Sequence, residues 1–211
     1  MGNTYMLARM VLLLALLFIT TPVYGQTVAG LLNGFYGAAW GSTVEEFPGG
    51  AKTLLRQDSD LLPCPGEKAA GLPEGKRCFI DKLSGLMIEE PYMQNLERVV
   101  VLTPLKPLLI NGVTVDKARY IYYKNRLSMI YLDHADIQQL RDALAKDLGK
   151  PHYKDDKVTA WMAANATLEE QVARPGEVIE VAVFCDSIKN QVAVVHSQWY
   201  FEMSRINTNI K

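Results

Sequence analysis

The chain has 211 residues, of which 22 are basic and 23 acidic, and its net charge at pH 7 is −1. This balance shows no basic excess of the kind that binds nucleic acid or an anionic membrane surface, so we expect no nucleic-acid partner. Apolar residues make up 49% of the chain and charged residues 21%, which is ordinary for a globular protein with a substantial core.

The first 25 residues have the order of a cleavable secretory signal peptide. Arg9 is their only charged side chain, residues 10–19 form an uninterrupted apolar run, and a polar stretch with a proline follows. Gly25 is small enough for a signal peptidase, so we predict cleavage near Gly25/Gln26. A membrane anchor needs about 20 apolar residues, twice the length of this run.

The predicted mature chain is expected in the periplasm or outside the cell. A bacterial lipoprotein carries a cysteine at its cleavage site, whereas the first cysteine here is Cys64. No later stretch approaches the length of a membrane span, so we expect no integral membrane segment after signal cleavage. We predict one domain over residues 26–211, in which 26–98 and 99–211 are candidate subrepeats.

The first half of the mature chain gives short elements. Residues 34–41 alternate as a strand does, and Ser42 or Thr43 followed by Glu45 predicts the capped start of a short helix. Strands are expected near 77–82 and 86–89, with loops around them.

Two cysteines enclose a loop in this half. The segment between Cys64 and Cys78 is rich in glycine, proline and charge, and it has no apolar period. A disulfide across a loop of this size contributes roughly 3 kcal/mol, and an exported protein can form it. We therefore predict a Cys64–Cys78 bond. Cys185 ends an alternating apolar run, so we expect a buried thiol there rather than a nucleophile.

The second half gives the clearest pattern. We predict strands over residues 99–103, 113–123, 126–132, 157–163, 177–185 and 191–203, with a turn at residues 124–125. Between them lies a helix whose apolar face is Ile137, Leu140, Leu144 and Leu148, with Asp136 as its cap and Gly149 at its end. The sum predicts an α+β fold: a mainly antiparallel sheet packed on one face by a few helices.

No motif in the chain predicts a catalytic, cofactor or metal site. His134, His152 and His196 are widely separated, with no H-E-x-x-H or C-x-x-C pattern. Ser42 is the serine nearest to a nucleophile, but it lacks the G-x-S-x-G turn, and a helix cap explains it. Adjacent acids such as Glu45 and Glu46 point apart and make no acid–base pair.

Aromatic residues remain as candidates for recognition. Trp40, Trp161 and Trp199 either fill the core or join a binding surface. Tyr120 and Tyr122 lie on one face of the predicted strand 113–123, and if that face points outward they form a candidate recognition face.

The order of these pieces resembles a loose group of uncharacterised exported Gram-negative proteins. They open with a G-F-x-G-x-x-W-G segment, here residues 34–41, and later carry an L-G-x-P helix end and a strand with a tryptophan, here residues 148–151 and Trp161. The plan is also similar to that of SmpA/OmlA-like envelope lipoproteins and of the β-lactamase-inhibitor-like fold. Those are binding and scaffolding proteins, although the lipid-anchor cysteine is missing here.

We therefore expect a non-enzymatic binding or envelope-accessory protein of the periplasm, whose partner is an unknown envelope protein or a small ligand. The alternative is an envelope hydrolase or redox protein with a site assembled from scattered residues, such as His134, His152 or Cys185.

Overall fold

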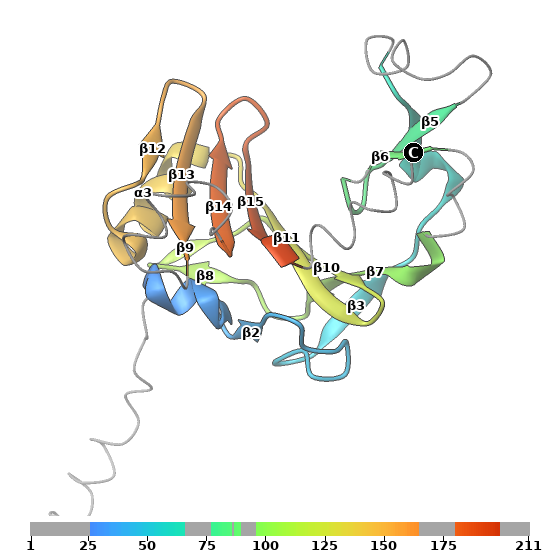
Figure 1. The fold of residues 1–211 in the computed structure, drawn as a ribbon, viewed down its shortest axis with the longest axis horizontal. Helices are drawn as coiled ribbons and strands as arrows, with labels where there is room; N and C mark the ends of the chain where they lie inside the picture. Colours follow the sequence, from blue (N-terminus) through green and yellow to red (C-terminus); the bar gives the residue numbers. More distant parts are fainter. Residues whose placement is uncertain (1–25, 66–76, 86, 90–95, 165–179, 199–211) are drawn as a thin grey trace, which may run out of the picture.

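The computed structural model describes residues 26–65, 77–85, 87–89, 96–164 and 180–198. Its main element is an eight-stranded sheet with the strand order β12-β13-β14-β15-β11-β10-β7-β3, in which every neighbouring pair is antiparallel (Figure 1). Its strands are β3 (Ala51–Leu54), β7 (Val99–Pro104), β10 (Lys117–Tyr123), β11 (Arg126–Asp133), β12 (Tyr153–Lys154), β13 (Val158–Ala163), β14 (Val181–Asp186) and β15 (Gln191–His196).

Short elements surround this sheet. They are the 3-10 turns η1 (Ala29–Leu32) and η2 (Asp58–Asp60), the helix α3 (Ile137–Leu148), and the strands β1 (Gly34–Phe35), β2 (Ala38–Ala39), β4 (Leu61–Pro63), β5 (Cys78–Asp81), β6 (Met87–Glu89), β8 (Leu109–Ile110) and β9 (Val113–Thr114). The prediction of a mainly antiparallel sheet is confirmed. Within the described residues the complete helical elements are the α-helix α3 and short 3-10 turns, rather than several α-helices.

The helix α3 forms as the sequence predicts. Asp136 accepts a hydrogen bond from the backbone N–H of Gln139 at 3.0 Å, which caps the helix, and Gly149 ends it at a φ of 73°. Leu140, Ala143, Leu144 and Leu148 are the buried residues of the helix, and they pack on the sheet. We call the sheet face under α3 the inner face.

The hairpin β10–β11 lies in the interior of the sheet, between β15 and β7. Lys124 and Asn125 both have positive φ, 48° and 59°, as the central residues of a two-residue type I′ turn do. This turn matches the twist of the strands that it joins. The predicted strand over residues 113–123 is split into β9 and β10, since the chain turns between them.

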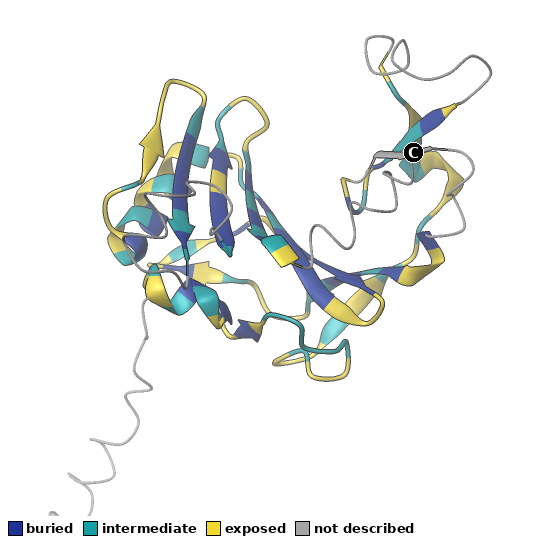
Figure 2. Cartoon of the chain, viewed as in Figure 1, coloured by how far each residue is buried: buried dark blue, intermediate teal, exposed yellow. Residues whose placement is uncertain are grey.

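The inner face holds the main core, and the strands that contribute to it are largely buried (Figure 2). Trp161 is fully buried there, and its indole N–H donates to the carbonyl of Gly149 at 2.9 Å. Cys185 is buried on the same face, as predicted from the alternation of β14. The inner core thus joins β13 and β14 to the end of α3.

Tyr120 and Tyr122 also lie on the inner face, so the prediction of an outward recognition face at these residues is wrong. They are 3% and 0% exposed, respectively, and both belong to the main core. Alternation correctly puts them on one face, but it cannot say which face of a central strand is covered. Here α3 and the β1–β2 segment cover their side.

The Tyr122 hydroxyl leads to a prediction about stability. It is buried without a hydrogen bond of normal geometry among the described residues, although the Ser42 hydroxyl lies close enough to oppose the rise that burial gives its pKa, so Tyr122→Phe removes a poorly satisfied polar group. We expect the free energy of unfolding to rise by up to about 1 kcal/mol in urea titrations. The matched control is Tyr36→Phe, which removes a hydroxyl that donates to Asp147 at 2.5 Å and is expected to cost about 1 kcal/mol. A large loss in the Tyr122 variant would contradict the assignment.

The segment 34–47 differs in detail from its prediction. Residues 34–39 form a hairpin with two residues in each strand. A side chain at Gly34 would clash, because its Cβ would lie 2.3 Å from the carbonyl oxygen of Ala38. The expected helix after Ser42 is one turn only, closed by Glu46, whose carboxylate accepts from the N–H of Thr43 at 2.8 Å. Pro48 follows at once and stops the chain from extending the turn.

A second layer covers part of the opposite, outer face of the sheet. We call η2, β4, β5 and β6 the arm, and its strands pair in the order β4-β5-β6. Leu61 and Leu83 of the arm region pack with Val101, Ile121 and Met129 of the sheet in a second apolar cluster. The predicted Cys64–Cys78 disulfide is present and joins the chain just after β4 to β5.

Some predictions fall on residues that the structure does not describe. These are the signal peptide over residues 1–25, Trp199, the start of the predicted strand 177–185 and the end of the predicted strand 191–203. In the described part of the chain, no helix has the length and apolar character that a membrane crossing requires.

Candidate functional site

The outer face of the sheet carries three parallel rows of side chains that cross the strands. Residues directly opposite each other in antiparallel neighbours point to the same face, so the strand register defines each row. Phe184 of β14 stands at the centre of the middle row, and Cys185 beside it points to the inner core. At the β7 and β10 end the rows run under the arm, and towards β12 they lie beyond it.

The middle row alternates aromatic residues with alanines, and we call it the aromatic row. In strand order from β12 to β10 it runs Tyr153, Ala160, Phe184, Ala193, Tyr131 and Arg119. Tyr153 is 49% exposed and Phe184 is 38% exposed, whereas Ala160 between them is buried. The two exposed rings are therefore separated by a strand that contributes only a methyl group.

A row of polar side chains borders the aromatic row on the side of the β12–β13 and β14–β15 turns. From β13 to β10 it runs Val158, Asp186, Gln191, Asp133 and Lys117. The Gln191 side chain donates to Asp133 at 2.8 Å, and Asp186 accepts from the backbone N–H groups of Ile188 and Lys189. Burial alone raises the pKa of Asp186, but these hydrogen bonds and the Lys189 ammonium lower it below its ordinary value.

A row of apolar side chains borders the aromatic row on its other side. It runs Met162, Ala182, Val195, Met129, Ile121 and Val101 from β13 to β7. At its β7 end this row enters the apolar cluster under the arm, whereas Met162 at the β13 end is half-buried.

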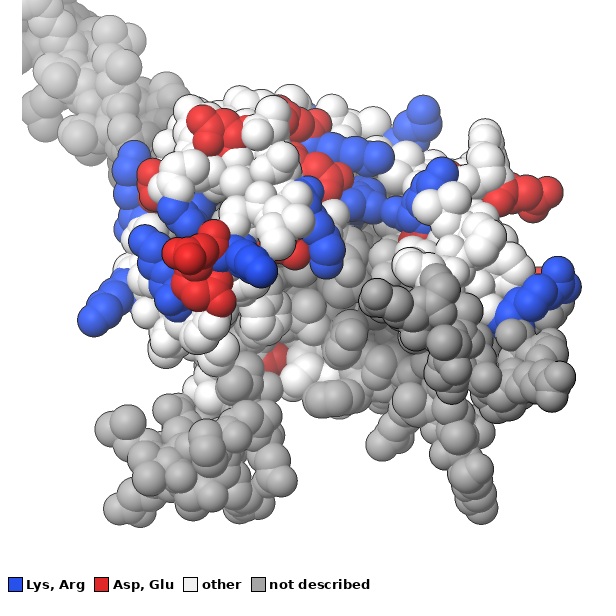
Figure 3. Space-filling view, turned by 90° about the horizontal axis from the view of Figure 1, so that it is seen from above, with Lys and Arg blue, Asp and Glu red and all other residues white. Residues whose placement is uncertain are grey.

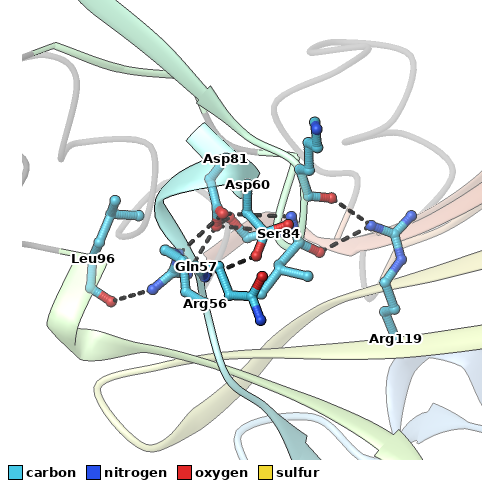
Figure 4. A network of polar contacts seen from close by, with 9 residues as sticks. Arg56, Gln57, Asp60, Asp81, Ser84, Leu96 and Arg119 are labelled. Atoms are coloured by element: carbon cyan, nitrogen blue, oxygen red, sulfur yellow. Dashed lines mark hydrogen bonds and ion pairs between the residues drawn. The ribbon is translucent and has the colours of Figure 1, made fainter. Parts of the chain in front are cut away.

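Arg119 closes the aromatic row where the arm begins. Its guanidinium lies 5.2 Å from the centre of the Tyr131 ring and donates to both carboxylate oxygens of Asp133 at 3.1–3.2 Å. The same group donates to the carbonyls of Lys82 and Leu83 in the turn after β5 (Figure 4). Arg119 thus fixes the arm to the sheet and ends the exposed part of the row.

A buried ion pair holds the arm itself. Arg56 donates two hydrogen bonds to the Asp81 carboxylate, at 2.8 and 3.0 Å, and a third to the carbonyl of Leu96 (Figure 4). Ser84 adds its N–H and hydroxyl to the same carboxylate. Burial raises the pKa of Asp81, but the bonds from Arg56 and Ser84 outweigh it, and the pKa lies below its ordinary value.

Charges of both signs are interleaved on the end of the molecule seen in Figure 3. Of the acids on the polar row, Asp133 is paired with Arg119, and Asp186 lies 3.4 Å from the Lys189 ammonium. Both acids of the polar row thus have a cationic neighbour within the protein.

The histidines named by the sequence make separate contacts. His134 lies between Asp116 and Gln139 at the start of α3, and the His152 ring accepts from the N–H of Met162. His196 lies on the inner side against Trp40, with its pKa lowered by burial, which Glu180 opposes. Within the described residues, no group of three His, Cys, Asp or Glu side chains is placed to hold a metal ion.

Cys185 gives a prediction about thiol reactivity. Burial raises the pKa of its thiol to about 11, and the side chain is covered by the inner core. We expect native protein to react with a thiol-specific dye at pH 8 only as fast as it unfolds, because the thiolate is the reactive form. One thiol per chain should react at once in denaturant. Rapid reaction of the native protein would show that Cys185 is accessible.

The sequence patterns did not single out Phe184 or Tyr153. Alternation along residues 178–185 places Phe184 on the opposite face of the strand from Cys185. This alternation was the available signal that Phe184 lies outside the core. It was not decisive, because a phenylalanine in a predicted strand more often fills a core.

Fold and site together define a class: an antiparallel sheet protein whose outer face carries an exposed aromatic row beside a covering arm. A comparison of the chain with protein-family models, curated proteins and solved structures finds no match.

Proposed function

We propose that this chain is an exported, non-enzymatic binding protein of the periplasm, and that it binds its ligand on the aromatic row. The observation that carries the proposal is the exposure of two rings on one face of the sheet, Tyr153 on the edge strand β12 and Phe184 on β14. Exposed aromatic side chains on a fixed backbone are the commonest anchors of binding surfaces, since they bury much area and lose little entropy.

The rigidity of the site supports a role in binding. Phe184 is held between β13 and β15 by full ladders on both sides, and the face beneath it is the inner core. A preformed surface avoids the cost of ordering side chains and loops when the ligand arrives. The row therefore meets the main requirement for specific recognition without any catalytic group.

Export is the second part of the proposal. The Cys64–Cys78 disulfide is compatible with an oxidising compartment. The residue after the proposed cut, Gln26, is already part of the fold, because its side chain accepts from the N–H of Tyr36 at 2.8 Å and donates to the carbonyl of Gly34 at 3.3 Å. Signal removal before Gln26 leaves these contacts intact.

The binding claim predicts the effect of Phe184→Ala. Immobilised mature protein should retain an envelope component that the variant retains at least tenfold less, since truncation of a central aromatic anchor costs at least about 1.4 kcal/mol. Leu109→Ala is the matched control, because Leu109 is 58% exposed on β8, away from the row. Equal retention by all three proteins, or none by the wild type, would refute the proposal.

The export claim has a separate test. Intact mass and N-terminal sequencing of protein from the periplasmic fraction should give a chain that starts at Gln26 with two hydrogens fewer than the reduced form. A chain that starts at Met1, or three reactive thiols, would contradict it.

A further inference from the structure

We propose that the ligand of the aromatic row is an extended β-1,4-linked glycan strand. This inference rests on the proposed function and names the chemical class of its ligand. It is carried by three features of the outer face: the spacing of the exposed rings, the polar row along one side of them, and the internal compensation of charge.

The spacing of the rings suits a β-1,4-linked sugar chain. Tyr153 is on β12 and Phe184 on β14, with Ala160 of β13 directly between them in register. Neighbouring strands lie about 4.8 Å apart, so the two strands that carry the rings lie about 9.6 Å apart across the sheet. Successive sugars of a β-1,4 chain are turned over, so the same face of the sugar recurs at every second sugar. The length of this two-sugar repeat is close to the spacing between β12 and β14. The apolar C–H face of a sugar packs on an aromatic ring, and the alanine leaves room for the sugar between.

The polar row supplies partners for the sugar hydroxyls. Gln191 and Asp133 lie two residues along their strands from Ala193 and Tyr131 and so point to the same face, and Asp186 lies beside Phe184 in the same way. Carboxylate and amide oxygens accept hydrogen bonds from hydroxyl groups. A glycan strand that packs on the two rings thus has hydrogen-bond acceptors of the polar row along one of its edges.

The charge around the row favours a neutral ligand over a polyanion or a polycation. Asp133 is bound by Arg119 and Asp186 by Lys189, and two further charged groups near the row have opposite signs, Lys117 on the polar row and Asp155, which accepts from the Tyr153 hydroxyl. A charged polymer gains nothing from such a surface. A hydroxyl-rich, uncharged backbone is complementary to it.

The twist of the sheet determines which physical form of the glycan can bind. Adjacent strands are rotated by roughly 20–25° relative to one another, so the rings do not share a plane. A single flexible strand can follow this twist, whereas the flat face of a crystalline polysaccharide cannot. The proposal is therefore for single glycan strands.

The test is binding of the mature protein to defined glycans. Protein-free peptidoglycan sacculi and soluble chitohexaose present amino-sugar chains, and cellohexaose presents glucose chains. We expect co-sedimentation with sacculi, or an affinity for one of the hexasaccharides in calorimetry, that falls at least tenfold in both Tyr153→Ala and Phe184→Ala. Phe184→Trp should retain binding because it keeps an aromatic face, and Leu109→Ala should bind as the wild type does.

The outcomes separate this inference from the proposed function. Loss of glycan binding in the two row variants supports both the glycan inference and the proposed function. The glycan that binds then shows the source of the sugar. Absence of binding to all three probes, or binding that the row variants leave unchanged, overturns the glycan inference. If an envelope protein is then retained in a Phe184-dependent manner, the proposed function stands with a protein ligand. If nothing depends on Phe184, both fail.

Discussion

Replacement of Asp81 by alanine is expected to lower the free energy of unfolding by about 3–5 kcal/mol. The Asp81 side chain is fully buried and receives two hydrogen bonds from Arg56 and two from Ser84. Removal of the carboxylate leaves the largely buried Arg56 guanidinium without its counterion, and this uncompensated charge is the source of the cost. Denaturant unfolding monitored by circular dichroism measures it.

The same pair makes stability depend on pH in a defined direction. The pKa of Asp81 is lower in the folded protein, so its contribution to stability is fully present above the unfolded pKa of the carboxyl. It is lost as the pH falls through the folded pKa. The wild type should therefore lose more stability than Asp81→Ala on acidification. Asp58→Ala, at an exposed acid of η2, is the control and should change little. Parallel acid profiles for wild type and Asp81→Ala would contradict the account.

Loss of the Cys64–Cys78 disulfide is expected to be the next largest effect. The two cysteines are 14 residues apart, and closing a loop of this size is worth roughly 3 kcal/mol through the entropy of the unfolded chain. The double variant Cys64→Ala, Cys78→Ala should unfold at a lower denaturant concentration by this amount. Thermal melts with and without reductant check the origin of the effect.

The internal control is the response to the reductant. The wild type should be destabilised by it, and the double variant should not respond, because Cys185 forms no disulfide in the structure. If the reductant leaves the stability of the wild type unchanged, the disulfide does not constrain the unfolded chain.

Several elements were predictable because local chemistry dictates them. Asp136 and Gly149 mark the ends of α3 as a capping residue and a positive-φ glycine do. The turn at Lys124 and Asn125 lies between two strands rich in β-branched and aromatic residues, so β10 and β11 were legible as a pair. Cys185 was correctly placed in the core because its whole face of the strand is apolar.

Other features depended on the tertiary arrangement. Alternation puts Tyr120 and Tyr122 on one face, but the position of α3 decides that this face is buried. The aromatic row joins residues from six strands, and no local pattern relates Tyr153 to Phe184 before the strand order is known. The Arg56–Asp81 pair likewise links residues 25 positions apart, which meet when β4 pairs with β5 in the arm.

Site-specific photo-crosslinking tests the central claim most directly, because it locates the ligand on the protein. A photoreactive phenylalanine analogue replaces Phe184 or Tyr153 on the aromatic row, or Leu109 on β8 as the reference position, in the exported protein within intact envelopes. We predict adducts from positions 184 and 153 and none from position 109. Adducts from position 109 with none from 184 and 153, or equal yields at all three positions, would show that the aromatic row is not the binding surface.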